Sequence, residues 1–365
     1  MPTTGFWKGK RVLVTGHTGF KGSWLCLWLK SRGAEVSGLS LAPHTIPSLY
    51  GLAGVSDGLS STIGDIRDSG VVLTSVRKAR PEIIFHLAAQ ALVRASYRDP
   101  VSTYATNVMG TVHLLEATRV TEGVRAVVVV TSDKCYENRE WVWGYRESDP
   151  VGGHDPYSSS KGCAELVTSA YRRSFFSASS ATPVGLDVGL ASARGGNVIG
   201  GGDWAEDRII PDFVRAISRG APLQVRHPGS IRPWQHVLEP LAGYMLLAEQ
   251  LWTRPEKYAE AWNFGPNLGE AKPVSWIADY VVGRWGDGAR WENVGSGKEP
   301  HEARSLKLDC SHARAELGWA PKLDLRKTLD WTTDWYRGWV RGERPLDLVL
   351  GQIEGYEKLE GDFDG

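Results

Sequence analysis

Residues 11–32 read RVLVTGHTGFKGSWLCLWLKSR, and this stretch decides the fold. Its apolar start, Arg11–Thr15, predicts a short strand, and the helical spacing of the apolar residues over Ser23–Arg32 predicts a helix. Between them lies a glycine-rich turn with Gly16, Gly19 and Gly22. Glycines there let the backbone approach a pyrophosphate, and the following helix N-terminus offers free N–H donors. The stretch therefore predicts a dinucleotide site, provided that further strands follow.

Further strand patterns do follow, and they alternate with helical stretches. We predict strands at 34–41, 61–63, 83–87 and 126–131, continuing at 185–190 and 261–264. This alternation indicates an α/β fold: a Rossmann-type, doubly wound parallel sheet with a smaller, partly interleaved C-terminal substrate domain. We expect residues 1–190 to form the cofactor domain, with segments near 235–265 returning to it, and 191–345 to form most of the second domain. The polar tail, 346–365, is expected to be an irregular extension.

Composition limits the partners and the compartment. The chain has 365 residues, with Lys plus Arg and Asp plus Glu equal at 42 each, so no net field attracts nucleic acid or an anionic membrane. No apolar run approaches the ~18 residues of a membrane span, and the start of the chain leads straight into a strand. The four cysteines lack CxxC spacing, which predicts neither a metal site nor disulfides. A cytoplasmic protein is expected.

A group of reactive side chains follows the buried apolar run 126–130. Thr131-Ser-Asp-Lys-Cys-Tyr136 stands at the predicted carboxyl end of that strand, where ligands bind in open α/β sheets. Tyr157 and Lys161 come next, four residues apart on a predicted helix and therefore on one face of it. An ammonium beside the phenol would lower its pKa and make Tyr157 a base. The catalytic candidates are Ser132, Asp133, Lys134, Tyr157 and Lys161.

These motifs resemble the extended short-chain dehydrogenase/reductase family. The resemblance rests on Thr-Gly-x-x-Gly-Phe-x-Gly at 15–22, His86-Leu-Ala-Ala-Gln90, Ser132 and the Tyr157/Lys161 pair. It continues through Arg194-Gly-Gly-Asn197, Arg232-Pro-Trp and Leu317-Gly-Trp-Ala-Pro321, which are similar to the nucleotide-sugar-binding half of that family. It implies a nicotinamide cofactor and a nucleotide-sugar substrate.

The resemblance also implies which residues contact the cofactor: Gly16, His17, Gly19, Phe20, Gly22, Asp65, Ile66, Leu87, Ala88, Ala89, Tyr157 and Lys161. Asp65 is expected to accept hydrogen bonds from the adenine amino group, or, alternatively, to cap the helix that follows. The acid that usually binds the adenosine ribose is missing from Leu39-Ser-Leu-Ala-Pro43, and no arginine there selects a 2′-phosphate. We expect NAD, with NADP left open.

Asp133 and Lys134 separate the possible reactions, because elimination of water needs an acid and a base beyond the Ser, Tyr and Lys of a simple epimerase. The resemblance makes Asp133 the acid and Lys134 the base, where related dTDP-glucose dehydratases have Glu. It implies a hydro-lyase, a nucleotide-sugar 4,6-dehydratase that converts CDP-glucose into its 4-keto-6-deoxy product, with Ser132 holding the carbon 4 oxygen. Lys134 would need a pKa lowered by burial and by Lys161. The alternative is an Asp133–Lys134 ion pair that only orders the loop.

Candidates for binding the nucleotide sugar are Gln90, Ser132, Asn197, Arg208, Arg232 and Arg304. The nucleotide base cannot be read from them. Another dehydratase, an epimerase on another nucleotide sugar and, more remotely, a non-catalytic NAD-binding regulator remain open. Helices predicted near 102–120 and 157–176 carry apolar residues beyond one stripe. We therefore expect a homodimer or a higher homo-oligomer, with a tightly packed monomer as the alternative.

Overall fold

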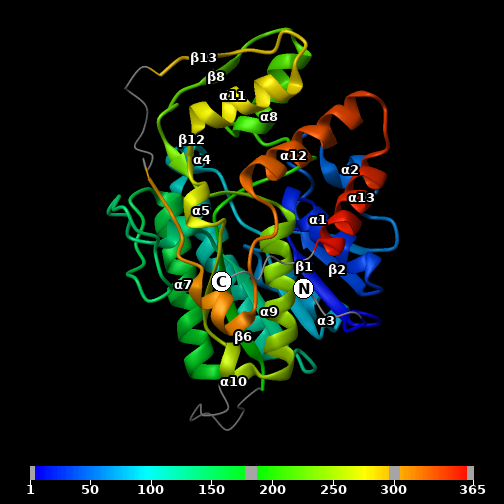
Figure 1. Cartoon of the computed structure of the whole chain (residues 1–365). Coiled ribbons are helices and arrows are strands. Elements are labelled where there is room, and N and C mark those ends of the chain that lie inside the picture. The colour runs from blue at the N-terminus through cyan, green and yellow to red at the C-terminus, as the bar shows by residue number, and fades with distance from the viewer. Residues whose placement is uncertain (1–4, 177–186, 296–304, 360–365) are drawn as a thin grey trace.

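A seven-stranded parallel sheet forms the centre of the protein (Figure 1). The computed structural model describes residues 5–176, 187–295 and 305–359. The strand order is β11-β6-β5-β4-β1-β2-β3, and all neighbouring pairs run parallel. The strands are β1 (Arg11–Thr15), β2 (Glu35–Ser40), β3 (Ser60–Ile63), β4 (Ile83–His86), β5 (Ala126–Val130), β6 (Gly189–Gly195) and β11 (Ala261–Phe264). The predicted doubly wound sheet is confirmed.

The strand predicted at 185–190 is displaced. Residues 185 and 186 lie outside the described part of the chain, and β6 runs on to Gly195 with every residue buried. It continues because β6 pairs with β5 on one side and β11 on the other, which buries even Ser192 and Arg194. Those polar residues hid the strand in the sequence.

Helices cover both faces of the sheet, as alternating strand residues require. Val12 and Val14 face a core shared with α1 (Phe20–Ser31) and α9 (Leu238–Thr253). Leu13 faces a second core with α3 (Ser69–Ala79) and α6 (Gly110–Arg119), against which α7 (Pro156–Phe175) packs. Burial on both faces explains the continuous apolar strands.

The helix predicted near 102–120 is interrupted. It consists of α5 (Pro100–Tyr104), a π-helical turn η1 (Ala105–Met109) and α6, preceded by α4 (Val93–Arg98). The helix predicted at 157–176 is α7, which begins at Pro156 because Asp155 caps it, accepting a hydrogen bond from Ser158 N at 2.9 Å.

A second lobe, at the top of Figure 1, gathers α8 (Ile209–Ser218), α11 (Val274–Trp285) and the strand pair β8 (Leu223–Val225) and β13 (Trp291–Asn293). Two more small pairs lead into it: β7 (Asn197–Ile199) with β10 (Trp234–His236), and β9 (Ile231–Arg232) with β12 (Lys272–Pro273). The remaining short elements are α2 (Leu49–Leu52), α10 (Pro255–Tyr258), η2 (Asp133–Cys135), η3 (Leu268–Glu270) and η4 (Ala313–Leu317). The domain boundaries stay a prediction.

The expectation of an irregular tail is wrong over most of its length. After α12 (Leu325–Val340), α13 spans Pro345–Lys358 and buries Val349, Ile353 and Tyr356. These three residues stand four and three apart, so they share one face of the helix. The glycines and charges between them obscured that pattern.

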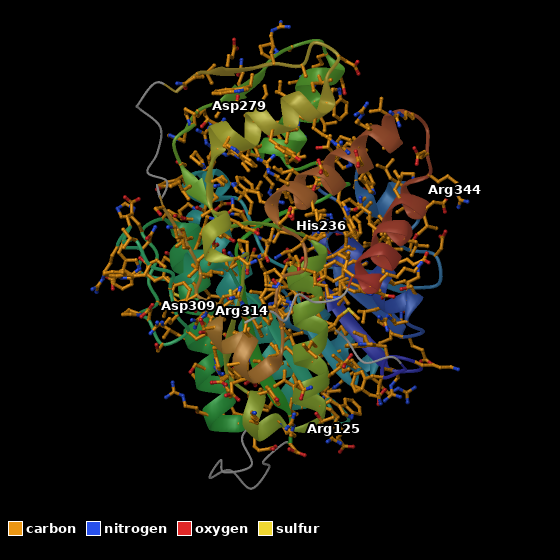
Figure 2. The ribbon with its side chains drawn as sticks, viewed as in Figure 1. Arg125, His236, Asp279, Asp309, Arg314 and Arg344 are labelled. Atoms are coloured by element: carbon orange, nitrogen blue, oxygen red, sulfur yellow. The ribbon has the colours of Figure 1, made fainter. Side chains whose placement is uncertain are left out.

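His236 joins the first helix to the C-terminal part of the chain (Figure 2). Its ring makes edge-to-face contacts with Trp24 of α1 at 6.0 Å and Trp331 of α12 at 5.8 Å between centroids. Burial lowers the pKa of His236 to about 3, so it packs as a neutral ring.

Among the helices described, none has the length and apolarity to cross a bilayer.

Candidate active site

A cleft of about 320 Å³ opens where β5 ends, between the sheet and the second lobe. Parallel strands point their carboxyl ends and the helix N-termini after them into such a crevice. The cleft brings together eight residues predicted from the sequence: Phe20, Ser132, Asp133, Lys134, Tyr157, Asn197, Arg208 and Arg232. Residues more than 200 apart in the chain thus meet in one place, from Phe20 to Arg232.

Ser132, Asp133 and Lys134 form a connected group on η2. The Ser132 side chain caps this short turn, accepting from Lys134 N at 3.2 Å, and donates to Asp133 Oδ1 at 2.9 Å. Lys134 Nζ lies 3.6 Å from the same oxygen and donates to Asn197 Oδ1 at 3.3 Å. Asp133 is 1% exposed, and its Oδ2 has no hydrogen-bond partner among the described residues. The Asp133–Lys134 ion pair, which the loop-ordering alternative requires, is therefore present. The second carboxylate oxygen of Asp133 takes no part in it.

Tyr157 and Lys161 are buried on the face of α7 that adjoins this group. Burial raises the pKa of Tyr157 to about 12, although its hydrogen bond with Ser132 acts the other way. Lys161 Nζ donates to the Val130 carbonyl at 3.3 Å, and burial lowers the pKa of Lys161 to about 8. The expected lowering of the phenol pKa by Lys161 is not found in this structure, because desolvation of the phenol outweighs every other influence on it.

The glycine turn after β1 fits a dinucleotide pyrophosphate. Gly16 has φ +78°, and a Cβ there would lie 2.8 Å from the Ala88 backbone nitrogen. The turn is thus pressed against the residues that follow β4, Leu87–Ala89. Gly19 begins α1 without a side-chain cap, so backbone N–H groups of the first turn stay available to an anion. His17 is buried beside this turn, with Nε2 2.8 Å from Ser61 Oγ.

Asp65 does not cap the following helix, so that alternative is wrong. The cap of α3 is Asp68, which accepts from the backbone nitrogens of Gly70 and Val71. Asp65 instead accepts from Arg67 N at 2.9 Å and Arg67 Nε at 2.8 Å. Ile66 is buried, and its contact with a cofactor, like that of Asp65, stays a prediction.

Gln90, a predicted substrate residue, is not among the described residues that line the cleft. The Gln90 side-chain amide donates to the Leu92 carbonyl and to Thr103 Oγ1, both at 3.0 Å, and so shapes its own loop. Arg304 lies outside the described residues. Their contacts with a sugar nucleotide remain predictions.

Other residues of the cleft were not predicted from the sequence. Lys21 lies in the cleft, and burial, assisted by the charges of Lys161 and Arg208, lowers its pKa to about 7. Its position inside the glycine motif was the available signal. Asp203 accepts from Arg208 Nη1 at 2.7 Å and so fixes one predicted binding residue. Three more lining residues form a charged chain, in which Asp207 contacts Arg226 at 2.7 Å and Arg94 at 3.9 Å.

Known proteins resemble this chain over nearly its whole length. The family model described as GDP-mannose 4,6 dehydratase matches residues 13–332. The chain belongs to this family. It is 55% identical to a CDP-glucose 4,6-dehydratase of Salmonella typhimurium over 96% of this chain and 97% of that one. The resemblance to extended short-chain dehydrogenases/reductases is thereby confirmed.

More distant members of the family share the fold. A dTDP-glucose 4,6-dehydratase of Streptomyces antibioticus is 30% identical over 88% of this chain and 91% of its own. The structure of a dTDP-glucose 4,6-dehydratase from Streptomyces venezuelae, solved with NAD bound, aligns with a TM-score of 0.75 and 26% identity. That alignment covers 92% of this chain and 99% of the other.

Proposed function

We propose that this protein is an NAD-dependent nucleotide-sugar 4,6-dehydratase whose substrate is CDP-glucose. The observation that carries the proposal is the Asp133–Lys134 pair, which stands in one cleft with Ser132 and Tyr157. An epimerase needs no such acid–base pair. The 55% identity to a CDP-glucose 4,6-dehydratase supports both the reaction and the nucleotide.

NAD fits the turn between β1 and α1, where it would supply reversible oxidation at carbon 4 of the sugar within each turnover. Gly16, Gly19 and the first-turn N–H groups of α1 would hold its pyrophosphate. Asp65, Ile66 and Leu87–Ala89 would hold the rest, with Lys161 at the nicotinamide ribose. The NAD bound in the Streptomyces venezuelae relative supports this assignment.

Ser132 would bind the carbon 4 hydroxyl of the sugar, and Tyr157 would take its proton. Their shared hydrogen bond places a hydroxyl beside the phenol, where both can contact the same sugar oxygen. Ser132 holds that oxygen as charge develops, and Tyr157 receives its proton. Since the raised pKa keeps the phenol protonated, Tyr157 can accept this proton only while it gives its own to a second base. Lys161, one helical turn later on α7 and with a pKa lowered to about 8, would be that base.

Asp133 and Lys134 would carry out the elimination. Lys134 Nζ takes the proton from carbon 5, the electron pair forms the carbon 5–carbon 6 double bond, and the carbon 6 hydroxyl leaves as water with a proton from Asp133. In the ion pair the proton is on Lys134, whereas these roles need it on Asp133. Moving that proton across 3.6 Å, from Lys134 to Asp133, gives a neutral amine and a neutral carboxylic acid, which is the form that the reaction needs.

The nucleotide end would lie toward the second lobe. Arg232 is buried on β9 and lines the cleft, and Arg208 is held by Asp203. Two guanidinium groups suit a pyrophosphate. Asn197 would contact the sugar side, next to Lys134.

We further propose a cytoplasmic homodimer. Large apolar side chains are exposed on neighbouring elements, with Val101 of α5 at 79%, Met109 of η1 at 46% and Leu166 of α7 at 61%. A partner subunit that packs against α5, η1 and α7 would cover them.

The test is incubation of the purified protein with NAD and, separately, CDP-glucose, dTDP-glucose, UDP-glucose and GDP-mannose, followed by mass spectrometry. The proposal expects a nucleotide sugar lighter by one water from CDP-glucose. Loss of water from another substrate alone would overturn the nucleotide assignment. An isomer with unchanged mass would mean an epimerase, and no turnover of any substrate would favour a regulator.

A further inference from the structure

A buried ion pair adjoins the cleft and has no part in the chemistry described above. Glu165 of α7 and Arg194 of β6 are 4% and 5% exposed, and Arg194 Nη2 donates to Glu165 Oε2 at 2.8 Å. Glu165 stands one helical turn after Lys161, so the two side chains share a face of α7. Removing two charges from water is costly, so a buried pair of this kind needs further hydrogen bonds to offset that cost. Its other contacts therefore show which parts of the chain it holds in place.

The carboxylate of the pair holds the start of the elimination segment, which we define as residues 131–136. Thr131 Oγ1 donates to Glu165 Oε1, and Ser192 Oγ donates to Glu165 Oε2 at 2.7 Å. Thr131 immediately precedes Ser132. The position at which the segment leaves β5 is therefore fixed to α7 and β6.

The guanidinium of the pair holds the end of the same segment. Arg194 Nη1 donates to Tyr136 Oη at 2.8 Å, and its guanidinium lies 4.9 Å from the centre of the Tyr136 ring. Tyr136 Oη in turn donates to Asn263 Oδ1 at 2.7 Å. The Asn263 amide donates to the carbonyls of Tyr145 and of Asp309, which is labelled in Figure 2.

We propose that the Glu165–Arg194 pair is a positioning device that fixes both ends of residues 131–136 and thereby aims Asp133 and Lys134 at carbons 5 and 6. The proposal rests on the proposed function. Asp133 and Lys134 stand on a single short turn, so their placement depends on the two tethered ends. Tyr157 and Lys161 stand on the long helix α7, outside this segment, and only Tyr157 contacts it, through the hydrogen bond with Ser132. The pair thus acts mainly on elimination, which takes both its acid and its base from the segment, whereas the oxidation takes only Ser132 from it.

The test uses Thr131→Val, Tyr136→Phe and the double variant, because these remove one or both tethers and leave the ion pair in place. Their matched controls are Thr332→Val and Tyr356→Phe. Thr332 is a buried threonine whose hydroxyl donates to the Thr328 carbonyl, and Tyr356 is a buried tyrosine whose hydroxyl donates to the Glu239 carboxylate at 2.7 Å. Both controls lie outside the cleft.

Three measurements are made on each protein: kcat and KM for loss of water from CDP-glucose, absorbance of the reduced cofactor in a single turnover, and hydrogen–deuterium exchange of residues 131–136. Since a misplacement of about 1 Å costs about 10²-fold, we expect kcat to fall about tenfold for each tether and about 10²-fold for both. KM should change less than kcat, because Ser132 is the one residue of this segment that is proposed to contact the bound substrate. Reduced cofactor should accumulate, and exchange over 131–136 should become faster.

Two results would overturn the proposal. One is normal exchange over residues 131–136 in the double variant, which is decisive even if the wild-type protein does not act on CDP-glucose and the proposed function fails. The other is a wild-type protein that dehydrates CDP-glucose while the double variant has an unchanged kcat, or one that falls no further than in the controls at equal thermal stability.

Discussion

At the residue scale, the proposed elimination makes Asp133 the acid and Lys134 the base. Lys134→Met removes the amine that would take the carbon 5 proton, and Asp133→Asn removes the acid while keeping its shape. Each is expected to slow loss of water from CDP-glucose by about 10²–10⁴-fold, the usual contribution of a positioned acid or base. Mass spectrometry of timed samples measures the rate.

The matched control is Lys257→Met, which breaks a surface ion pair of 2.9 Å with Glu316. It should leave the rate unchanged. A normal rate of water loss in Lys134→Met would mean that the ion pair only orders the loop and that another group removes the proton.

Lys161 should make stability depend on pH. Burial lowers its pKa from 10.5 to about 8, so between these pH values the unfolded chain binds more protons than the folded one. The contribution of Lys161 to the free energy of unfolding is therefore least favourable below pH 8 and improves by roughly 3 kcal/mol as the pH rises through this window.

The comparison is with Lys161→Met, using denaturant unfolding across the same window. The variant should be more stable relative to the wild type below pH 8, and this advantage should shrink toward pH 10.5. A difference that does not vary with pH would show that Lys161 is not a buried ammonium.

At the scale of elements, α13 packs against the first helix, α1. Glu357 accepts from Trp28 Nε1 at 2.6 Å and from Arg32 Nε at 2.8 Å, both on or next to α1. The buried face of α13 also packs against α12. A tail expected to be irregular is thus part of the core.

Ile353→Ala tests this packing. Ile353 is 3% exposed, so its truncation should lower the free energy of unfolding by about 2–4 kcal/mol through lost burial and a cavity. Its neighbour Glu354 pairs with Lys358 at the surface, and Glu354→Ala should leave the free energy of unfolding nearly unchanged. Equal, small effects in denaturant unfolding would show that α13 does not pack here in solution.

At the scale of the whole molecule, the proposed dimer requires the exposed apolar residues of α5, η1 and α7 to be covered. Leu166→Glu places a charge among them and should convert the dimer into a monomer, because burying an unpaired carboxylate is strongly unfavourable. Leu268→Glu is the control, since Leu268 is 53% exposed on η3, in a different part of the chain. Sedimentation velocity decides, and a wild-type monomer at micromolar concentration would remove the proposal.

The sequence by itself determined the sheet and the edge of it at which the candidate catalytic residues lie. The apolar strands β1, β4 and β5 and the glycine turn after β1 are local patterns, which the chain carries within a few residues. Since polar residues after parallel strands meet at one edge, Ser132, Asp133, Lys134 and Tyr157 could be assigned to one cleft. The need of a nucleotide-sugar pyrophosphate for cations and polar groups added Asn197, Arg208 and Arg232, which the structure places in the same cleft.

Only the tertiary structure decided the contacts between residues distant in the chain and the pKa values that burial changes. Arg194 forms an ion pair with Glu165, which is 29 residues away in the sequence. Trp28 donates a hydrogen bond to Glu357, which is 329 residues away. Neither contact leaves a periodic signal in the sequence. The raised pKa of Tyr157 and the lowered pKa of Lys21 likewise follow from how much protein surrounds each group. Hydrophobic periodicity reports which face of an element is buried, but desolvation and long-range ion pairs are set by the packed neighbours, which exist only after the chain has folded.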